Sequence, residues 1–270
     1  MNPVEITCGS SPVILGLPHT GTYVPPDIMG RLNAEGRKLR DTDWHVHTLY
    51  DGLLDGATTV RATFHRYVID ANRDPTGTSL YPGQSTTGLV PLTDFDNQPI
   101  WQPGAEPTAD DITTRLKAFH APYHDALRAE IDRVVALHGV AVLYDCHSIR
   151  SMCPFLFDGR LPDFNIGTND GATSAPALEA AVTGICSETE GYNHVVNGRF
   201  RGGWTTRHYG RPRTGVHAIQ MELAQATHLA TETPPFDLDP GKAARLRKPL
   251  AAILARLQEI ALTMRPGARQ

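Results

Sequence analysis

Two histidines, His19 and His147, each stand at the end of an apolar run that is typical of a buried β-strand. Neutral imidazole binds Zn²⁺ well, and a catalytic zinc site needs three protein ligands with one position left for water. The segment Asp41-Thr42-Asp43 offers two carboxylates to complete the set, of which we favour Asp43. A single loop histidine is more often an ordinary hydrogen-bonded residue, so the prediction of a metal site depends on all three residues together.

Glu222 is our candidate for the general base. It follows the apolar residues Ile219 and Met221, and a carboxyl in such surroundings tends to have a raised pKa, which suits it to accept a proton from water. An ion pair with an arginine in the sheet is the alternative. Asp145 stands two residues before His147, on the same face of a strand, so it either orients that imidazole or is a simple strand-end acid.

Arginines indicate an anionic substrate. The guanidinium of Arg73 can bind a carboxylate through two parallel hydrogen bonds, and Asn72 beside it adds a neutral donor. The glycine-rich segment 197–213 carries five more arginines: Arg199, Arg201, Arg207, Arg211 and Arg213. Alone, such a segment is typical of a solvated loop or a phosphate site, but beside a metal site it indicates a clamp for a small anion.

Several other functions are disfavoured by the sequence. The net charge of -4 and the lack of interleaved basic and aromatic residues argue against nucleic acid. No apolar run is long enough for a membrane span, no signal peptide is apparent, and the four cysteines form no C-x-x-C pair, so we expect a cytoplasmic protein, monomeric or a small homo-oligomer. Cys146 and His147 are neighbours on a strand and point to opposite faces, which disfavours a Cys–His nucleophile.

The elements that must position these residues follow an α/β order. We expect strands at 12–17, 57–71, 140–148 and 217–223, and helices at 41–55, 108–138, 174–188 and 240–264. Segments 75–105 and 197–215 are predicted to be long loops, and the other histidines, including His120 and His124, look structural. Because sites gather at the carboxyl ends of parallel strands, the candidate residues are expected to converge there, within a single domain of residues 1–270.

The longest motifs resemble those of the N-formylglutamate amidohydrolase family. The matching stretches are PHTGTYVP (18–25), RDTDWHVHTLY (40–50), RYVIDANRDPTGTSLYPGQSTTGLVP (66–91), YDCHS (144–148), NGRFRGGWTTRHYGRP (197–212) and GVHAIQMEL (215–223). The resemblance implies a three-layer α/β sandwich with a mixed, mostly parallel sheet, similar to zinc carboxypeptidases. It also implies hydrolysis of N-formyl-L-glutamate to L-glutamate and formate, in histidine degradation.

These expectations combine into one hypothesis for the site. Zn²⁺, with Co²⁺ and Mn²⁺ as alternatives, is bound by His19, Asp43 and His147, and Glu222 moves the proton. Asn72 and Arg73 bind the substrate, and Arg73 also stabilises the transition state. Arg207 and Arg213 are expected to bind the glutamate carboxylates.

One departure and two alternatives accompany that hypothesis. Carboxypeptidases supply two metal ligands from an H-x-x-E motif, whereas Thr22 stands three residues after His19, so the third ligand must come from elsewhere. A zinc amidase or peptidase acting on another N-acyl amino acid or a cell-wall peptide is the alternative enzyme. A metal-dependent binding protein without catalysis is the alternative from another class.

Overall fold

A seven-stranded mixed sheet forms the centre of the protein. The computed structural model describes residues 1–79, 83 and 85–264. The strands lie in the order β1 (Val4–Thr7), β3 (Thr58–Ala62), β2 (Val13–Leu17), β4 (Ala141–Ile149), β7 (Val216–Ala224), β5 (Phe164–Gly167) and β6 (His194–Val196). The central four, β3, β2, β4 and β7, are mutually parallel. Strand β1 is antiparallel to β3 and β5 is antiparallel to β7, whereas β6 is parallel to β5.

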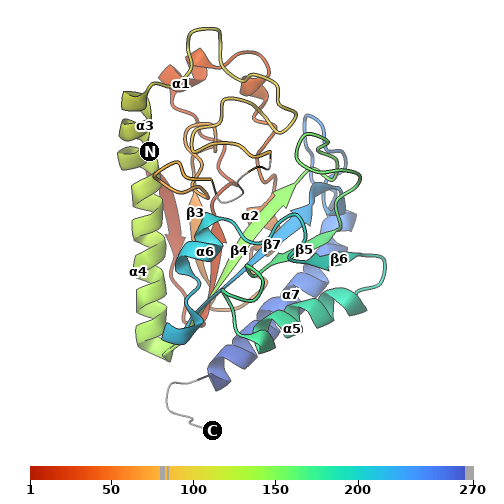
Figure 1. The fold of residues 1–270 in the computed structure, drawn as a ribbon. Helices are drawn as coiled ribbons and strands as arrows, with labels where there is room; N and C mark the ends of the chain where they lie inside the picture. Colours follow the sequence, from red (N-terminus) through yellow and green to blue (C-terminus); the bar gives the residue numbers. More distant parts are fainter. Residues whose placement is uncertain (80–82, 84, 265–270) are drawn as a thin grey trace.

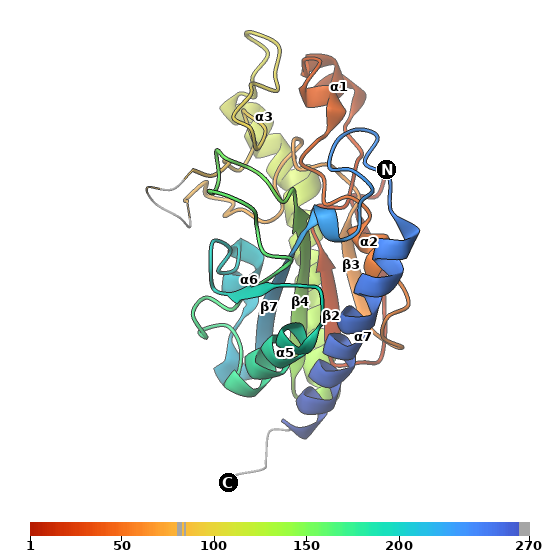
Figure 2. The ribbon, with the colours of Figure 1, turned by 90° about the vertical axis from the view of Figure 1, so that its right-hand side faces the viewer.

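Helices cover both faces of this sheet, which makes three layers (Figures 1 and 2). The first face packs against α3 (Ala109–Arg115), α4 (Ala121–His138) and α6 (Trp204–Tyr209), with Tyr123, Leu127 and Tyr209 in its core. The second face packs against α2 (Val46–Tyr50), α5 (Pro176–Glu188) and α7 (Pro240–Thr263). All nine residues of β4 are buried, as expected for a parallel strand covered on both sides. The predicted fold class is confirmed.

The long helical region at 109–138 is interrupted once. A π-helical turn, Leu116–His120, joins α3 to α4, and Thr108 caps α3 by accepting a hydrogen bond from the Asp111 amide. Pro122 explains the wide turn, because proline has no N–H to donate to the carbonyl four residues earlier. The sequence predicts a kink at this proline, and the structure has a π-turn there instead.

Other expectations need correction at the level of elements. The helix expected at 41–55 is limited to α2, because the residues before it form turns and His45 has a left-handed backbone with φ 59°. The strands expected at 57–71 reduce to β3. The loop expected at 197–215 contains α6 and a short 3-10 turn, Pro212–Thr214. Residues 75–105 contain no helix or strand where the structure describes them.

Three short helical segments complete the description of the fold. Helix α1 spans Pro26–Arg31, and 3-10 turns lie at Gly36–Lys38 and Gln225–Thr227. Among the described helices, none combines the length and the apolar character that crossing a membrane requires.

Candidate metal centre

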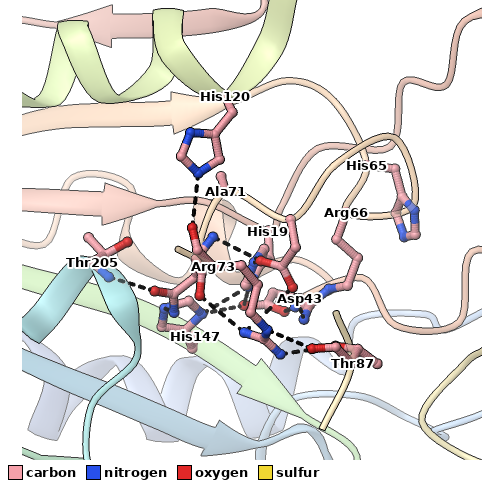
Figure 3. A network of polar contacts seen from close by, with 12 residues as sticks. His19, Asp43, His65, Arg66, Ala71, Arg73, Thr87, His120, His147 and Thr205 are labelled. Atoms are coloured by element: carbon pink, nitrogen blue, oxygen red, sulfur yellow. Dashed lines mark hydrogen bonds and ion pairs between the residues drawn. The ribbon is translucent and has the colours of Figure 1, made fainter. Parts of the chain in front are cut away.

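Three buried side chains converge at the carboxyl ends of β2 and β4 (Figure 3). His19 follows β2, Asp43 lies in the turn before α2, and His147 is the third residue from the end of β4. The Asp43 amide donates to the His19 carbonyl at 3.0 Å, which ties the two loop segments together. The Nδ1 atoms of the two histidines are 3.2 Å apart, and Asp43 Oδ2 lies 3.1 Å from His147 Nδ1 and 3.7 Å from His19 Nδ1.

These spacings fit a tetrahedral metal. Ligand bonds of about 2.0 to 2.1 Å give tetrahedral edges of about 3.3 to 3.4 Å, and the three observed separations lie around that value. Two imidazoles and a carboxylate are also the donor types that Zn²⁺ takes in catalytic sites. The residues present therefore fit a single divalent metal, with one coordination position left over.

A carboxylate holds the far nitrogen of each imidazole. His19 Nε2 lies 2.6 Å from Asp70 Oδ1, and His147 Nε2 lies 3.1 Å from Asp145 Oδ1. Asp145 is itself fixed by the Thr206 hydroxyl, which donates to its Oδ2 at 3.0 Å. Such carboxylate–histidine pairs orient the ring and place the other nitrogen toward the metal. Of the two roles considered for Asp145, this geometry favours the orienting one.

The structure separates the two candidate aspartates. Arg66 donates to Asp43 Oδ1 at 2.7 Å. Burial raises the pKa of Asp43, but this guanidinium and the rings of His147 and His19 together outweigh burial and lower it. Asp41 points elsewhere, because its Oδ2 accepts from the Tyr67 hydroxyl at 2.8 Å and the Phe95 amide at 3.1 Å. Burial raises the pKa of Asp41 to about 7. Asp43 alone of the two joins the histidine cluster.

Glu222 lies beside the cluster on the neighbouring strand. It is the direct partner of His147 in the parallel register of β4 and β7, and both side chains line the same cavity. Gln220 Nε2 donates to Glu222 Oε2 at 3.1 Å. Burial raises the pKa of Glu222 to about 8. The alternative considered from the sequence was an ion pair between Glu222 and an arginine. In the structure the Glu222 carboxyl accepts from the neutral amide of Gln220.

Asn72 and Arg73 also line this cavity. Asn72 Nδ2 lies 3.1 Å from His147 Nε2, and its Oδ1 accepts from the Thr205 amide at 2.8 Å. Arg73 is held by Thr87, whose carbonyl and hydroxyl oxygens each accept at 2.9 Å, and lies 3.6 Å from Asp70. Both residues therefore face the site where the sequence placed them.

Two of the predicted substrate ligands are not brought to the site. Arg213 lies just before β7, and Val216 and Glu222 are six residues apart on that strand, which at about 3.3 Å per residue is about 20 Å. Arg207 lies on α6, outside the cavity lining, and its Nε donates to the Gly202 carbonyl at 2.8 Å. Arg207 lies within the motif at 197–212 and Arg213 directly after it, and neither lines the cavity.

Sequence reasoning missed two other arginines. Arg66 and Arg199 line the cavity together with Arg73. Arg199 belongs to the glycine-rich segment singled out above, and its guanidinium is anchored by the carbonyls of Leu156 and Ser85, each at 2.8 Å. Arg66 gave no usable signal, because its partner Asp43 is 23 residues away in the sequence.

The protein combines an α/β fold with a candidate metal centre and an adjacent carboxylate. This combination of groups is typical of metal-dependent hydrolases. Comparison with known proteins narrows the class. The family model described as N-formylglutamate amidohydrolase matches residues 11–229. The chain therefore belongs to the N-formylglutamate amidohydrolase family, as its motifs predicted.

Individual relatives agree with this membership. N-formylglutamate deformylase of Pseudomonas aeruginosa is 46% identical over 252 residues, which cover 92% of this chain and 94% of that protein. The deformylase of Pseudomonas putida is 45% identical over the same shares. The crystal structure of an N-formylglutamate amidohydrolase from Ralstonia eutropha is 25% identical, with a TM-score of 0.80 over 97% of this chain and 98% of that one. A gene product of Agrobacterium tumefaciens shares the fold at 19% identity, with a TM-score of 0.72 over 96% of each chain.

Proposed function

We propose that this protein hydrolyses N-formyl-L-glutamate to L-glutamate and formate, using one Zn²⁺ bound by His19, Asp43 and His147. The convergence of these three donors beside Glu222, in a cavity lined by arginines, is the observation that carries the proposal. The relatives named above, which are N-formylglutamate deformylases, support the substrate. Hydrolysis of this substrate would serve the breakdown of histidine.

The metal would supply one part of the chemistry. A zinc ion at this position lowers the pKa of a water molecule and polarises the formyl carbonyl. The rest of the reaction depends on residues of the chain itself.

Glu222 is the proposed proton carrier. Its carboxylate accepts a proton as the water oxygen attacks the formyl carbon, and it returns that proton to the glutamate nitrogen as the C–N bond breaks. A pKa raised by burial suits both steps, because the group gains and loses its proton near neutral pH. Gln220 holds one oxygen of Glu222 and leaves the carboxyl facing the cavity.

Asn72 and Arg73 are the proposed donors to the substrate. Asn72 lies against the ring of His147 and lines the cavity, so we assign to its amide a hydrogen bond to the oxyanion as the carbonyl oxygen gains charge. Arg73 lies beside it, binds an anionic oxygen of the substrate and adds positive charge near the oxyanion. Arg199 takes the role that we had predicted for Arg207 and Arg213, that of a ligand to a glutamate carboxylate.

We also propose that the enzyme works in the cytoplasm. The four cysteines are unpaired in the structure, which is the usual state in a reducing compartment.

Release of L-glutamate, the product common to every member of a panel of N-acyl-L-glutamates, tests the proposed function. We expect N-formyl-L-glutamate to be hydrolysed, and N-acetyl-L-glutamate and N-carbamoyl-L-glutamate to be poor substrates. Preferred hydrolysis of an N-acetyl or N-carbamoyl compound would identify a related amidase instead. Zinc binding without hydrolysis of any member would favour a binding protein.

A further inference from the structure

Two histidines outside the cavity hold the backbone that carries Asn72 and Arg73. His120 Nε2 lies 3.0 Å from the Arg73 carbonyl oxygen, and His124 Nε2 lies 2.8 Å from the Ala71 carbonyl oxygen. Neither histidine lines the cavity, and both are buried. Figure 3 shows His120 reaching the Arg73 carbonyl from the side opposite the metal centre.

The protonation of both rings follows from their partners. A carbonyl oxygen only accepts hydrogen bonds, so Nε2 carries the proton in each histidine. On His124 the other nitrogen, Nδ1, lies 3.1 Å from the Tyr209 hydroxyl, which also donates to the His124 carbonyl at 3.2 Å. Burial lowers the pKa of both histidines, which keeps them neutral. Each ring is thus a fixed, neutral donor.

The helix and its neighbour fix these donors in place. His120 ends the π-helical turn and His124 stands four residues later on α4, so both rings lie on one face of the helix. Trp204 of α6 packs against them, with ring centroids 4.6 Å from His124 and 5.7 Å from His120. This packing prevents the rings from swinging away from residues 71–73.

Besides the two histidines, the Asp70 amide donates to the Leu89 carbonyl at 2.7 Å at the start of the 70–73 turn, and the side chains of Asn72 and Arg73 have the partners described above. Within the turn, the Asn72 amide donates to Asp70 Oδ1 at 2.8 Å and the Arg73 amide to the Asp70 carbonyl at 3.2 Å. The Asn72 carbonyl accepts from the guanidinium of Arg73 itself. The two remaining carbonyls, of Ala71 and Arg73, accept from His124 on α4 and from His120 in the π-helical turn.

We propose that His120 and His124 are positioning residues, which clamp the backbone on both sides of Asn72 so that Asn72 and Arg73 meet the substrate. The inference rests on the proposed function for its substrate, and on the two hydrogen bonds for its geometry. If either donor is lost, a buried carbonyl loses its partner and the turn shifts to find another. The side chains of Asn72 and Arg73 shift with it, while the metal ligands, which lie on other segments, stay in place.

Replacing His120 tests the clamp by kinetics. His120→Phe keeps an aromatic ring and removes the donor, whereas His120→Gln keeps an N–H of similar reach. We expect His120→Phe to lower kcat/KM for N-formyl-L-glutamate about tenfold, which is the effect of one disturbed hydrogen bond. Its zinc content should remain that of the wild type. His120→Gln should restore most of the lost kcat/KM. His138→Phe is the matched control, because His138 on the same helix donates to the Ser10 carbonyl at 2.7 Å, far from the site.

A double-mutant cycle separates positioning from general structure. In an Arg73→Met background the guanidinium that His120 positions is already absent. We therefore expect the effect of His120→Phe on kcat/KM to fall to about twofold. An equal loss in both backgrounds, or no rescue by glutamine, would overturn the proposal.

Crystal structures give a readout that does not depend on the substrate. In His120→Phe we expect residues 71–73 to be displaced while His19, Asp43 and His147 superpose on the wild type. An undisplaced turn would overturn the clamp. A wild-type enzyme inactive on N-formyl-L-glutamate would instead refute the proposed function, and the crystallographic comparison would still decide the clamp.

Discussion

Glu222 and Arg199 differ in how their roles can be tested, because one moves a proton and the other binds charge. Glu222 is buried beside His147 and accepts from Gln220, so its protonation is set by its surroundings. Arg199 also lines the cavity, and its guanidinium donates to the carbonyls of Leu156 and Ser85. Substitutions at these residues should therefore affect different kinetic constants.

Glu222→Gln removes the proton acceptor and preserves the shape. We expect kcat to fall by about 10²- to 10⁴-fold with zinc content unchanged, since positioned acid–base groups contribute about that much. Glu130→Gln is the control, because Glu130 is a buried glutamate on α4 that pairs with Arg133 away from the site. Steady-state formate release checks both variants, and a Glu222→Gln enzyme with more than about a tenth of wild-type kcat contradicts the assignment.

Arg199→Met removes a charge from the cavity wall. We expect KM for N-formyl-L-glutamate to rise by about tenfold or more, because a charged hydrogen bond contributes about 1.5 to 3 kcal/mol. The neutral analogue N-formyl-L-glutamine should be much less affected if Arg199 binds the side-chain carboxylate. Arg201→Met is the control, since Arg201 is exposed on the same segment and pairs with Asp170. Equal KM changes for both arginines would remove Arg199 from the substrate site.

At the scale of elements, close packing of α6 against the 70–73 turn restricts the glycine-rich segment. A Cβ on Gly203 would lie 2.3 Å from Asn72 Nδ2, and Gly202 has φ 108°, a backbone that favours glycine. The Gly203 amide also donates to Gln220 Oε1 at 2.6 Å. The glycine pair thus lets α6 approach both Asn72 and the strand that carries Glu222.

Gly203→Ala tests this contact. We expect it to displace Asn72 and to lower kcat/KM by about tenfold or more, since misplacement of a catalytic group by about 1 Å is enough for a large loss. Gly184→Ala is the control: Gly184 lies on α5 with no atom near the added methyl, so it should raise the free energy of unfolding by about 0.5 to 1 kcal/mol. Kinetics and urea unfolding measure both effects. Unchanged kinetics in Gly203→Ala would show that Asn72 tolerates the methyl.

The same elements show what sequence alone reveals. Strands β2, β4 and β7 and helices α4, α5 and α7 were predicted because their apolar periodicity or composition is strong. Strand β1 has one buried residue in four, β5 and β6 are only four and three residues long, and α6 is a six-residue helix in a segment that resembles a loop. These short elements are stabilised by tertiary contacts, so a local pattern does not reveal them.

The site follows the same division. His19, His147 and Glu222 were predicted because strand ends place them at one edge of the sheet. Asn72-Arg73 were expected at the end of a strand over 57–71, but β3 ends at Ala62 and turns carry them to the site. The sequence already favours Asp43 over Asp41, but the contacts that account for this choice, and the pairing of Arg66 with Asp43, join segments far apart in the chain. Arg207 and Arg213 were chosen from the arginine-rich segment 197–213, whose sequence gives no information on which arginines face the cavity.

At the scale of the whole molecule, buried neutral histidines couple stability to pH. Burial lowers the pKa of His65 and His124 well below the ordinary value, and that of His228 to about 4. The unfolded chain binds these protons near pH 6.5, whereas the folded protein resists them. Their contribution to stability is therefore complete above pH 6.5 and is lost as the pH falls toward 4.

We expect the free energy of unfolding to fall as the pH is lowered from 6.5 to 4.5. His228→Gln keeps an N–H for the Trp44 carbonyl, which His228 now contacts at 3.0 Å, and removes one titrating group. The pH dependence of this variant should be shallower by up to about 1.4 kcal/mol per pH unit in that range. Urea unfolding at stepped pH measures it, and identical slopes would mean that His228 takes up its proton without unfolding.

The central claim is that His19, Asp43 and His147 bind the metal on which hydrolysis depends. The most direct test measures zinc content and formate release for the wild type, Asp43→Asn and Asp41→Asn after chelation and stepwise addition of Zn²⁺. We predict that one equivalent restores full activity to the wild type and to Asp41→Asn, whose altered side chain lies outside the cluster. Asp43→Asn should neither retain the metal nor release formate. Full activity of the chelated wild type, or of Asp43→Asn, would contradict the account.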